Sequence, residues 1–132
     1  MSYSFLSRLS SLATVLASAM LVSACKFEFP PAISATVESY ETSTPVSQSE
    51  LTPDQLMTLS GWFARHKTGW ASSSASYVPS LIVRVKHVGG DTSVINVLST
   101  MVVVNNRDGQ QIQQLPSDEL AGLRRIVWSN QR

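Results

Sequence analysis

The stretch from Leu81 to Leu115 is the strongest constraint on the fold of this 132-residue chain. After Leu81, apolar residues alternate with polar ones, which is the period of a strand with one buried face. A continuous apolar run follows at Met101–Val104. Gly89-Gly90-Asp91 and Asn105–Gly109 separate these segments with residues typical of tight turns. The stretch therefore predicts an antiparallel meander of about four strands.

Two helices are predicted, one on each side of this meander in the sequence. Thr52-Pro53-Asp54-Gln55 supplies a capping hydroxyl, a proline at the first helical position and a glutamine at the third. The first helix should therefore run from Pro53 to about Lys67. Ser117, followed by two acidic residues, indicates the start of the second helix. Because each helix carries one apolar stripe, we expect an α+β fold with both helices packed on one face of the meander.

The N-terminal part of the chain has the features of a secretion signal. About eleven apolar residues, Leu12 to Val22, are too few to span about 30 Å of hydrocarbon as a helix. They lead into Leu21-Val22-Ser23-Ala24-Cys25, which looks like a bacterial lipobox. Cys25 is the only cysteine, and we predict that it is lipidated after removal of residues 1–24. The alternative is an ordinary cleaved signal followed by a free thiol, which is a liability in an oxidising compartment.

A lipidated Cys25 would make the lipid bilayer one partner of this protein. Each buried methylene contributes about 0.8 kcal/mol, so several acyl chains hold a protein firmly without a transmembrane helix. Lys26 follows the cysteine. In lipoproteins of this kind an aspartate at that place often marks retention in the inner membrane. Lys26 therefore favours the bacterial outer membrane, facing the periplasm.

Three regions are expected in the chain. Residues 1–24 form the signal peptide, residues 25–50 the lipidated cysteine and a flexible tether, and residues 51–132 a globular α+β domain. Pro30-Pro31 stiffens the tether, and residues 32–40 alternate well enough to form a possible edge strand. Glu41–Glu50 is rich in Ser, Thr, Glu, Gln and Pro and has almost nothing to bury, so it is interpreted as linker.

Composition and motifs favour binding over catalysis. The formal charge of +1 provides no basic field for nucleic acid. The two histidines, His66 and His87, lie on different predicted elements and are too few for a zinc site. The serines of the loop Trp70–Ser76 lie outside any nucleophile-elbow motif. We therefore predict no catalytic residue, no metal and no cofactor, and a protein that is not an enzyme.

The candidate partner-binding residues lie at the predicted hairpin tips. They are Asp91, Asn106, Arg107 and Asp108, because loops on a rigid sheet often carry binding residues. Arg107 is the best single anchor, since a guanidinium can form bidentate pairs. Trp70, at the exit of the first helix, is a further candidate. The alternatives are solvated turns for the tips, and core packing or a sugar-binding ring for Trp70.

Three segments carry a resemblance to a known group of proteins. They are Trp-Phe-Ala-Arg-His-Lys-Thr-Gly-Trp at residues 62–70, His-Val-Gly-Gly-Asp at 87–91 and Ser-Asp-Glu-Leu-Ala-Gly-Leu-Arg at 117–124. The chain resembles small lipoproteins of Xanthomonas-like bacteria, some of which act as immunity proteins beside secreted antibacterial toxins. The resemblance implies a membrane-held inhibitor of an incoming periplasmic toxin. The alternatives are a structural lipoprotein subunit of an envelope secretion complex and a peptidoglycan-binding protein.

Overall fold

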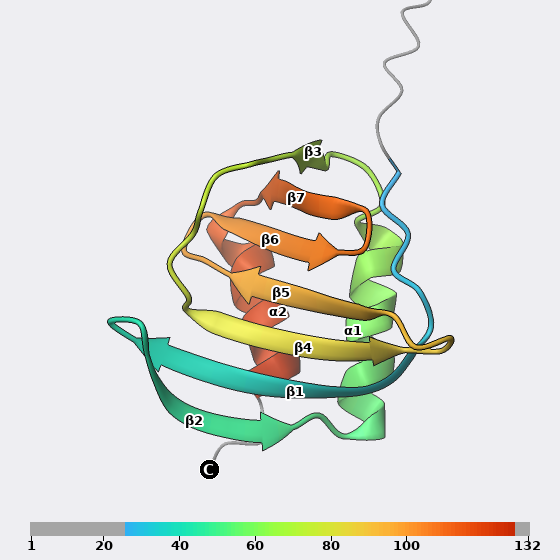
Figure 1. Cartoon of the computed structure of the whole chain (residues 1–132), viewed down its shortest axis with the longest axis horizontal. Helices are drawn as coiled ribbons and strands as arrows, with labels where there is room; N and C mark the ends of the chain where they lie inside the picture. The colour runs from blue at the N-terminus through green and yellow to red at the C-terminus, as the bar shows by residue number, and fades with distance from the viewer. Residues whose placement is uncertain (1–25, 129–132) are drawn as a thin grey trace, which may run out of the picture.

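The computed structural model describes residues 26–128 and contains one antiparallel sheet and two helices (Figure 1). The α+β class is thus as predicted, but the sheet has seven strands and not about four. The elements are β1 (Ala32–Glu41), β2 (Thr44–Glu50), α1 (Pro53–Arg65), β3 (Ala71–Ser72), β4 (Leu81–His87), β5 (Thr92–Val97), β6 (Met101–Asn106), β7 (Gly109–Gln114) and α2 (Ser117–Trp128).

The predicted meander forms one continuous part of this sheet. The strand order is β2-β1-β4-β5-β6-β7-β3, so β4 to β7 are neighbours in sequence order and all pairs are antiparallel. Glycines provide the left-handed backbone that the two turns need, with φ of 97° and 96° at Gly89 and Gly90 and 110° at Gly109. The additional strands extend the meander on both sides. β1 and then β2 continue the sheet beyond β4, and β3 continues it beyond β7.

The prediction of a tether over residues 25–50 is wrong for its second half. β1 is not an edge strand but lies between β2 and β4, and its Ala35 and Val37 face the core. β2 forms the edge. Most of its side chains are polar and exposed, but its backbone pairs with β1 along most of its length. The turn between them uses Thr42 and Ser43 at positive φ, without a glycine. Neither strand β2 nor this turn has a sequence pattern that indicates a strand or a hairpin.

The first half of the predicted tether is also wrong, because residues 26–31 pack onto the domain. The Phe27 side chain is only 4% exposed, and its ring centroid lies 5.5 Å from that of Phe63 and 4.9 Å from that of Trp70. Phe29 stacks on Phe63 at 4.4 Å. The Phe27 N–H donates to the Lys67 carbonyl at 2.8 Å. The folded domain therefore includes residues 26–31 and does not begin at residue 51.

Both helices cover the same face of the sheet and cross its strands, as predicted (Figure 1). The capping box of α1 is confirmed, with Thr52 and Gln55 exchanging hydrogen bonds. The helices run antiparallel, because Gln55 near the start of α1 donates to the Ile126 carbonyl, while Glu119 in the first turn of α2 meets His66. The helices bury one stripe each, Leu59, Trp62 and Phe63 of α1 and Leu120, Leu123 and Val127 of α2.

The opposite face of the sheet is partly covered by the segment 73–80. The side chain of Asn96 accepts from the Ser80 N–H at 3.2 Å and donates to the Val78 carbonyl at 3.1 Å. Gln110 donates to the Ala75 carbonyl at 2.7 Å. The loop Trp70–Ser76, interpreted from its sequence as a flexible connection, thus includes strand β3 and side-chain contacts that hold it on the sheet.

A charged cluster on this face gives the fold a defined dependence on pH. Tyr40 donates to one Glu38 oxygen at 2.6 Å, and the Arg84 Nε donates to the other at 3.3 Å. The hydrogen bond from Tyr40, together with the charge of Arg84, holds the pKa of Glu38 below its usual value of 4.5, although burial opposes this shift. As the pH falls, the Glu38 carboxylate is therefore protonated in the unfolded chain before it is protonated in the folded chain.

We expect Glu38 to stabilise the fold by about 1 kcal/mol at neutral pH relative to Glu38→Gln. This difference is fully present above the unfolded pKa of 4.5 and is lost as the pH falls through the lower folded pKa. Urea unfolding of both proteins at neutral pH and at about pH 3 measures it. A difference that does not shrink in acid would show that the ionised carboxylate is not the stabilising group.

Candidate functional site

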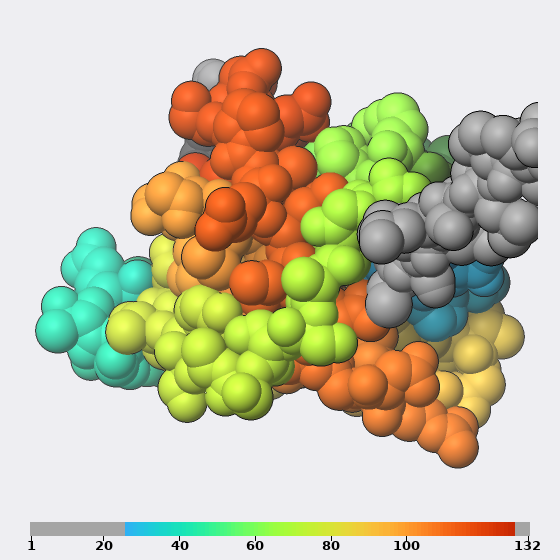
Figure 2. Space-filling view, turned by 90° about the horizontal axis from the view of Figure 1, so that it is seen from above, coloured from blue at the N-terminus to red at the C-terminus, as the bar shows by residue number. Residues whose placement is uncertain are grey.

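Four of the five predicted partner-binding residues meet at one hollow on the surface. Asp91 comes from the β4–β5 hairpin, and Asn106, Arg107 and Asp108 come from the β6–β7 hairpin. Glu28 and Pro30 of the N-terminal segment complete the rim, and the hollow has a volume of about 330 Å³. Figure 2 shows the N-terminal segment, in blue, beside the tip of the β4–β5 hairpin.

Local hydrogen bonds to backbone groups hold the hairpin tips in place. The Asn106 side-chain oxygen accepts from the Asp108 N–H at 2.8 Å, which closes the β6–β7 turn. The His87 N–H donates to the Asp91 carbonyl at 2.8 Å, which closes the β4–β5 turn. The Val88 N–H donates to the Pro31 carbonyl at 2.9 Å and ties the N-terminal segment to the same turn. Side chains at this site are thus carried by a fixed backbone.

The charged groups of the hollow are available to a ligand. Arg107 and Asp91 approach to 4.0 Å, but their side chains are 81% and 57% exposed, so the pair contributes little to stability. Glu28 and Asp108 are exposed as well. The hollow thus presents three carboxylates and one guanidinium, which suits a partner that is mainly basic at the contact.

His87 lies at the base of the hollow as a structural residue. Its ring is buried, with Nδ1 2.9 Å from the Pro30 carbonyl and Nε2 2.7 Å from the Ser93 hydroxyl. The carbonyl only accepts, so Nδ1 donates, and the Ser93 hydroxyl can donate to Nε2. The Phe29 ring meets the imidazole edge-on at 5.0 Å. Nδ1 therefore fastens Pro30 to the sheet, while Nε2 links β4 to β5.

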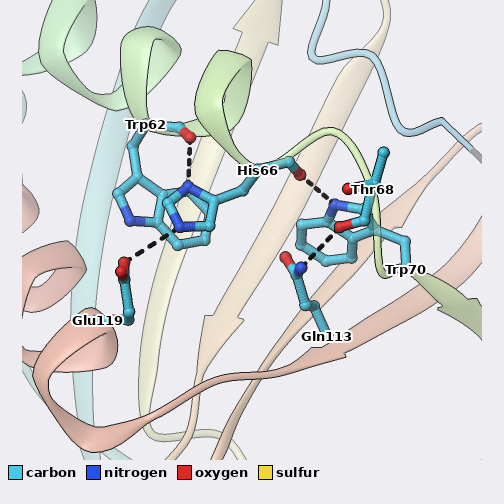
Figure 3. Close-up of polar contacts among 6 residues, drawn as sticks. All are labelled: Trp62, His66, Thr68, Trp70, Gln113 and Glu119. Atoms are coloured by element: carbon cyan, nitrogen blue, oxygen red, sulfur yellow. Dashed lines mark hydrogen bonds and ion pairs between the residues drawn. The ribbon is translucent and has the colours of Figure 1, made fainter.

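Trp70, the fifth predicted residue, does not belong to this surface. It is 5% exposed and packs among Phe27 and Phe63 in the aromatic core. Its indole Nε1 donates to the His66 carbonyl at 2.5 Å, which turns the ring inward after α1 (Figure 3). Predicting it as a partner-binding residue was wrong, because the turn through Gly69, with φ of 88°, sends the chain back over the core.

His66 lines a second hollow of about 440 Å³ between the two helices. Its ring stacks on Trp62 at 3.9 Å, and its Nδ1 lies 2.7 Å from the Trp62 carbonyl. Its Nε2 lies 3.1 Å from the Glu119 carboxylate (Figure 3). The Nε2 contact ties the end of α1 to α2, whereas the Nδ1 contact stays within the last turn of α1. Among residues 26–128, no group of three or more His, Cys, Asp or Glu side chains is placed to hold a metal ion.

A third hollow was missed by sequence reasoning. It lies at the C-terminal end of α2, has a volume of about 360 Å³ and includes Tyr40, Arg124, Arg125 and Trp128 in its lining. Arg124 is held by donation to the Leu98 carbonyl at 2.5 Å, while Arg125 is exposed. Because Tyr40 and Trp128 lie 88 positions apart in the chain, only the packing of β1 against α2 could reveal this hollow.

Comparisons with family models, with curated proteins and with solved structures give no match to this chain. Its interpretation therefore depends on its own residues. The predicted lipidation site, Cys25, lies outside the described residues, directly before Lys26. Within residues 26–128, neither helix is both long and apolar enough to cross a membrane.

Proposed function

We propose that this protein is a lipid-anchored module of the bacterial envelope that binds another protein through the hairpin-tip hollow. The anchor is the lipidated Cys25, and the expected location is the periplasmic side of the outer membrane. We further propose that the bound partner is an antibacterial toxin and that the protein acts as an immunity protein. The lipobox-like sequence and the resemblance to small lipoproteins support the anchor and the immunity role, respectively.

The convergence of two hairpins on one hollow is the observation that carries the binding proposal. Asp91 and Arg107 come from turns that are 16 positions apart, yet both are exposed and neither is required by the core. His87 and His66, the two histidines of the chain, are engaged in bonds between structural elements. A rigid surface with free charges and occupied histidines supports recognition of a protein more than catalysis.

The expected partner presents basic side chains around at least one carboxylate. The basic groups would meet Glu28, Asp91 and Asp108, and the carboxylate would meet the Arg107 guanidinium in a bidentate pair. Arginine is enriched among interface residues whose loss costs 2 kcal/mol or more. Arg107→Glu places a fourth acid on this surface and should weaken binding about tenfold or more.

A challenge by toxin-delivering sister cells tests this function. We expect a strain that lacks the gene to lose viability under attack, wild-type protein to restore survival, and Arg107→Glu to restore it poorly. Arg125→Glu is the matched control, because it makes the same charge change on an exposed arginine in the hollow at the end of α2. The amount of each variant in the envelope is measured by immunoblot.

Three outcomes would contradict parts of the proposal. Normal survival of the deletion strain would count against the immunity role. Equal protection by Arg107→Glu and the wild type would show that the hairpin-tip hollow is not the binding surface. Loss of protection by Arg125→Glu alone would assign the partner to the other hollow.

A further inference from the structure

We propose that the lipid on Cys25 holds the folded domain directly against the bilayer, without a spacer, and that the surface around Lys26 and Lys67 contacts the lipid headgroups. This inference rests on the proposed lipid anchor and concerns how the anchored domain is oriented. A lipoprotein with a flexible tether can turn freely above the membrane. The described residues of this chain leave no length for such a tether.

The first argument is the position at which the core begins. Phe27 is the second residue after Cys25, and it is buried between the rings of Phe63 and Trp70. Its N–H is hydrogen-bonded to the Lys67 carbonyl at the end of α1. Phe29 then stacks on Phe63. The chain is thus fixed to the domain from its second residue after the proposed attachment point.

The second argument is the reach of the remaining chain. Consecutive Cα atoms lie 3.8 Å apart, so the Cα of Cys25 can be at most about 8 Å from that of Phe27. A domain of about 100 residues has a radius of gyration of about 13 Å. The attachment point therefore stays on the surface of the domain, and acyl chains that enter the bilayer bring this surface to the headgroups.

The third argument is the chemistry of that surface. Lys26 and Lys67 are exposed and adjacent, because the bond from Phe27 to Lys67 brings the two segments together. Thr68 and Gly69 beside them are also exposed. A lysine close to an anionic membrane is attracted to its headgroups. Two carboxylates of the neighbouring segments have other contacts, since Glu28 lines the hairpin-tip hollow and Glu119 pairs with His66.

This orientation places the hairpin-tip hollow beside the membrane. Glu28 on its rim is three residues from Cys25, and its Cα is therefore at most about 11 Å from that of the lipidated residue. The hollow at the C-terminal end of α2 lies at the other end of β1, where it includes the Ser39–Leu81 pair. A partner at the hairpin tips would therefore be bound next to the bilayer surface.

Lysine footprinting tests the orientation on the natural side chains of the protein. The chain contains only three lysines, Lys26, Lys67 and Lys86, and all are exposed in the folded domain. The anchored protein is bound to vesicles of phosphatidylethanolamine with a minor share of phosphatidylglycerol and treated with a bulky amine-reactive reagent. We expect labelling of Lys26 and Lys67 to slow several-fold relative to the protein without vesicles, and to slow more than labelling of Lys86, which lies on the helix-free face of β4.

A spacer variant supplies the matched control. About ten Gly and Ser residues inserted between Cys25 and Lys26 give the tether that the natural chain lacks, with a mean span of about 17 Å. Labelling of Lys26 and Lys67 should then return to the rate without vesicles. Equal labelling of all three lysines in the natural chain on vesicles, or protection that the spacer does not relieve, would overturn the inference.

The same experiment separates this inference from the anchor itself. Protein isolated from membranes supplies the natural form, and the mass of its N-terminal peptide reports whether Cys25 carries lipid. Coupling a maleimide-phospholipid to Cys25, the only cysteine, supplies a chemically anchored form. A missing natural lipid would refute the proposed anchor. The footprint of the chemically anchored form would still support or overturn the orientation.

Discussion

A chain that begins at Leu51 is expected to remain unfolded, whereas a chain that begins at Lys26 is expected to fold. Removing residues 26–50 deletes β1 and β2 together with Phe27 and Phe29. β1 is an internal strand, so its loss exposes the backbone of β4 and the core residues that Ala35 and Val37 cover. A domain with a total stability of about 5–15 kcal/mol cannot absorb such a loss.

Circular dichroism and urea unfolding of the two truncated chains measure this difference. The chain from Lys26 should show one cooperative transition, as a small two-state domain does. The chain from Leu51 should show little native ellipticity and no cooperative transition. A cooperative transition in the shorter chain would mean that residues 26–50 are an appendage, as their sequence suggests, and not part of the domain.

The second large effect is expected from a single side chain, that of Phe27. Phe27→Ala should lower the free energy of unfolding by about 3–5 kcal/mol, the usual cost of emptying a buried phenylalanine site. The ring contacts Phe63 and Trp70, so its loss leaves a cavity between α1 and the residues that follow it. Because the substitution also frees the first residues after Cys25, it should mobilise the attachment point of the lipid.

Glu28→Ala is the control for this substitution. Glu28 is the next residue and is exposed, so its replacement should change the unfolding free energy by no more than about 0.5 kcal/mol. Urea unfolding of the two variants and the wild type gives both values. If Phe27→Ala lowered the free energy of unfolding as little as Glu28→Ala does, the N-terminal segment would not be docked on the domain in solution.

Sequence periodicity was sufficient to predict the elements whose burial repeats at regular intervals. β4 and both helices have such patterns, β6 has a continuous apolar run, and the capping box at Thr52 is confirmed. The β2 strand has no such pattern, since its polar residues gain their order from backbone pairing with β1. The turn at Thr42 and Ser43 contains no glycine, so the sequence carries no turn signal for the β1–β2 hairpin.

The candidate site could be predicted only where local sequence determines exposure. Hairpin tips are exposed by geometry, so Asp91 and Asn106–Asp108 were found, and the sheet register then placed them together. Trp70 was misassigned, because burial of an aromatic residue after a helix depends on distant residues such as Phe27. The available signal was the pattern Lys-Phe-Glu-Phe at residues 26–29, whose two aromatic rings are costly to leave exposed on a tether.

Fractionation of Cys25→Ser tests the central claim, that a lipid on one sulfur holds a folded protein-binding domain at the envelope. Wild-type protein should sediment with membranes and be released by detergent, with acyl mass on its N-terminal peptide. The Cys25→Ser protein should leave the membrane fraction, yet unfold at the same urea concentration after purification. Membrane association that is unchanged in Cys25→Ser, or wild-type protein found free in the cytosol, would contradict the account.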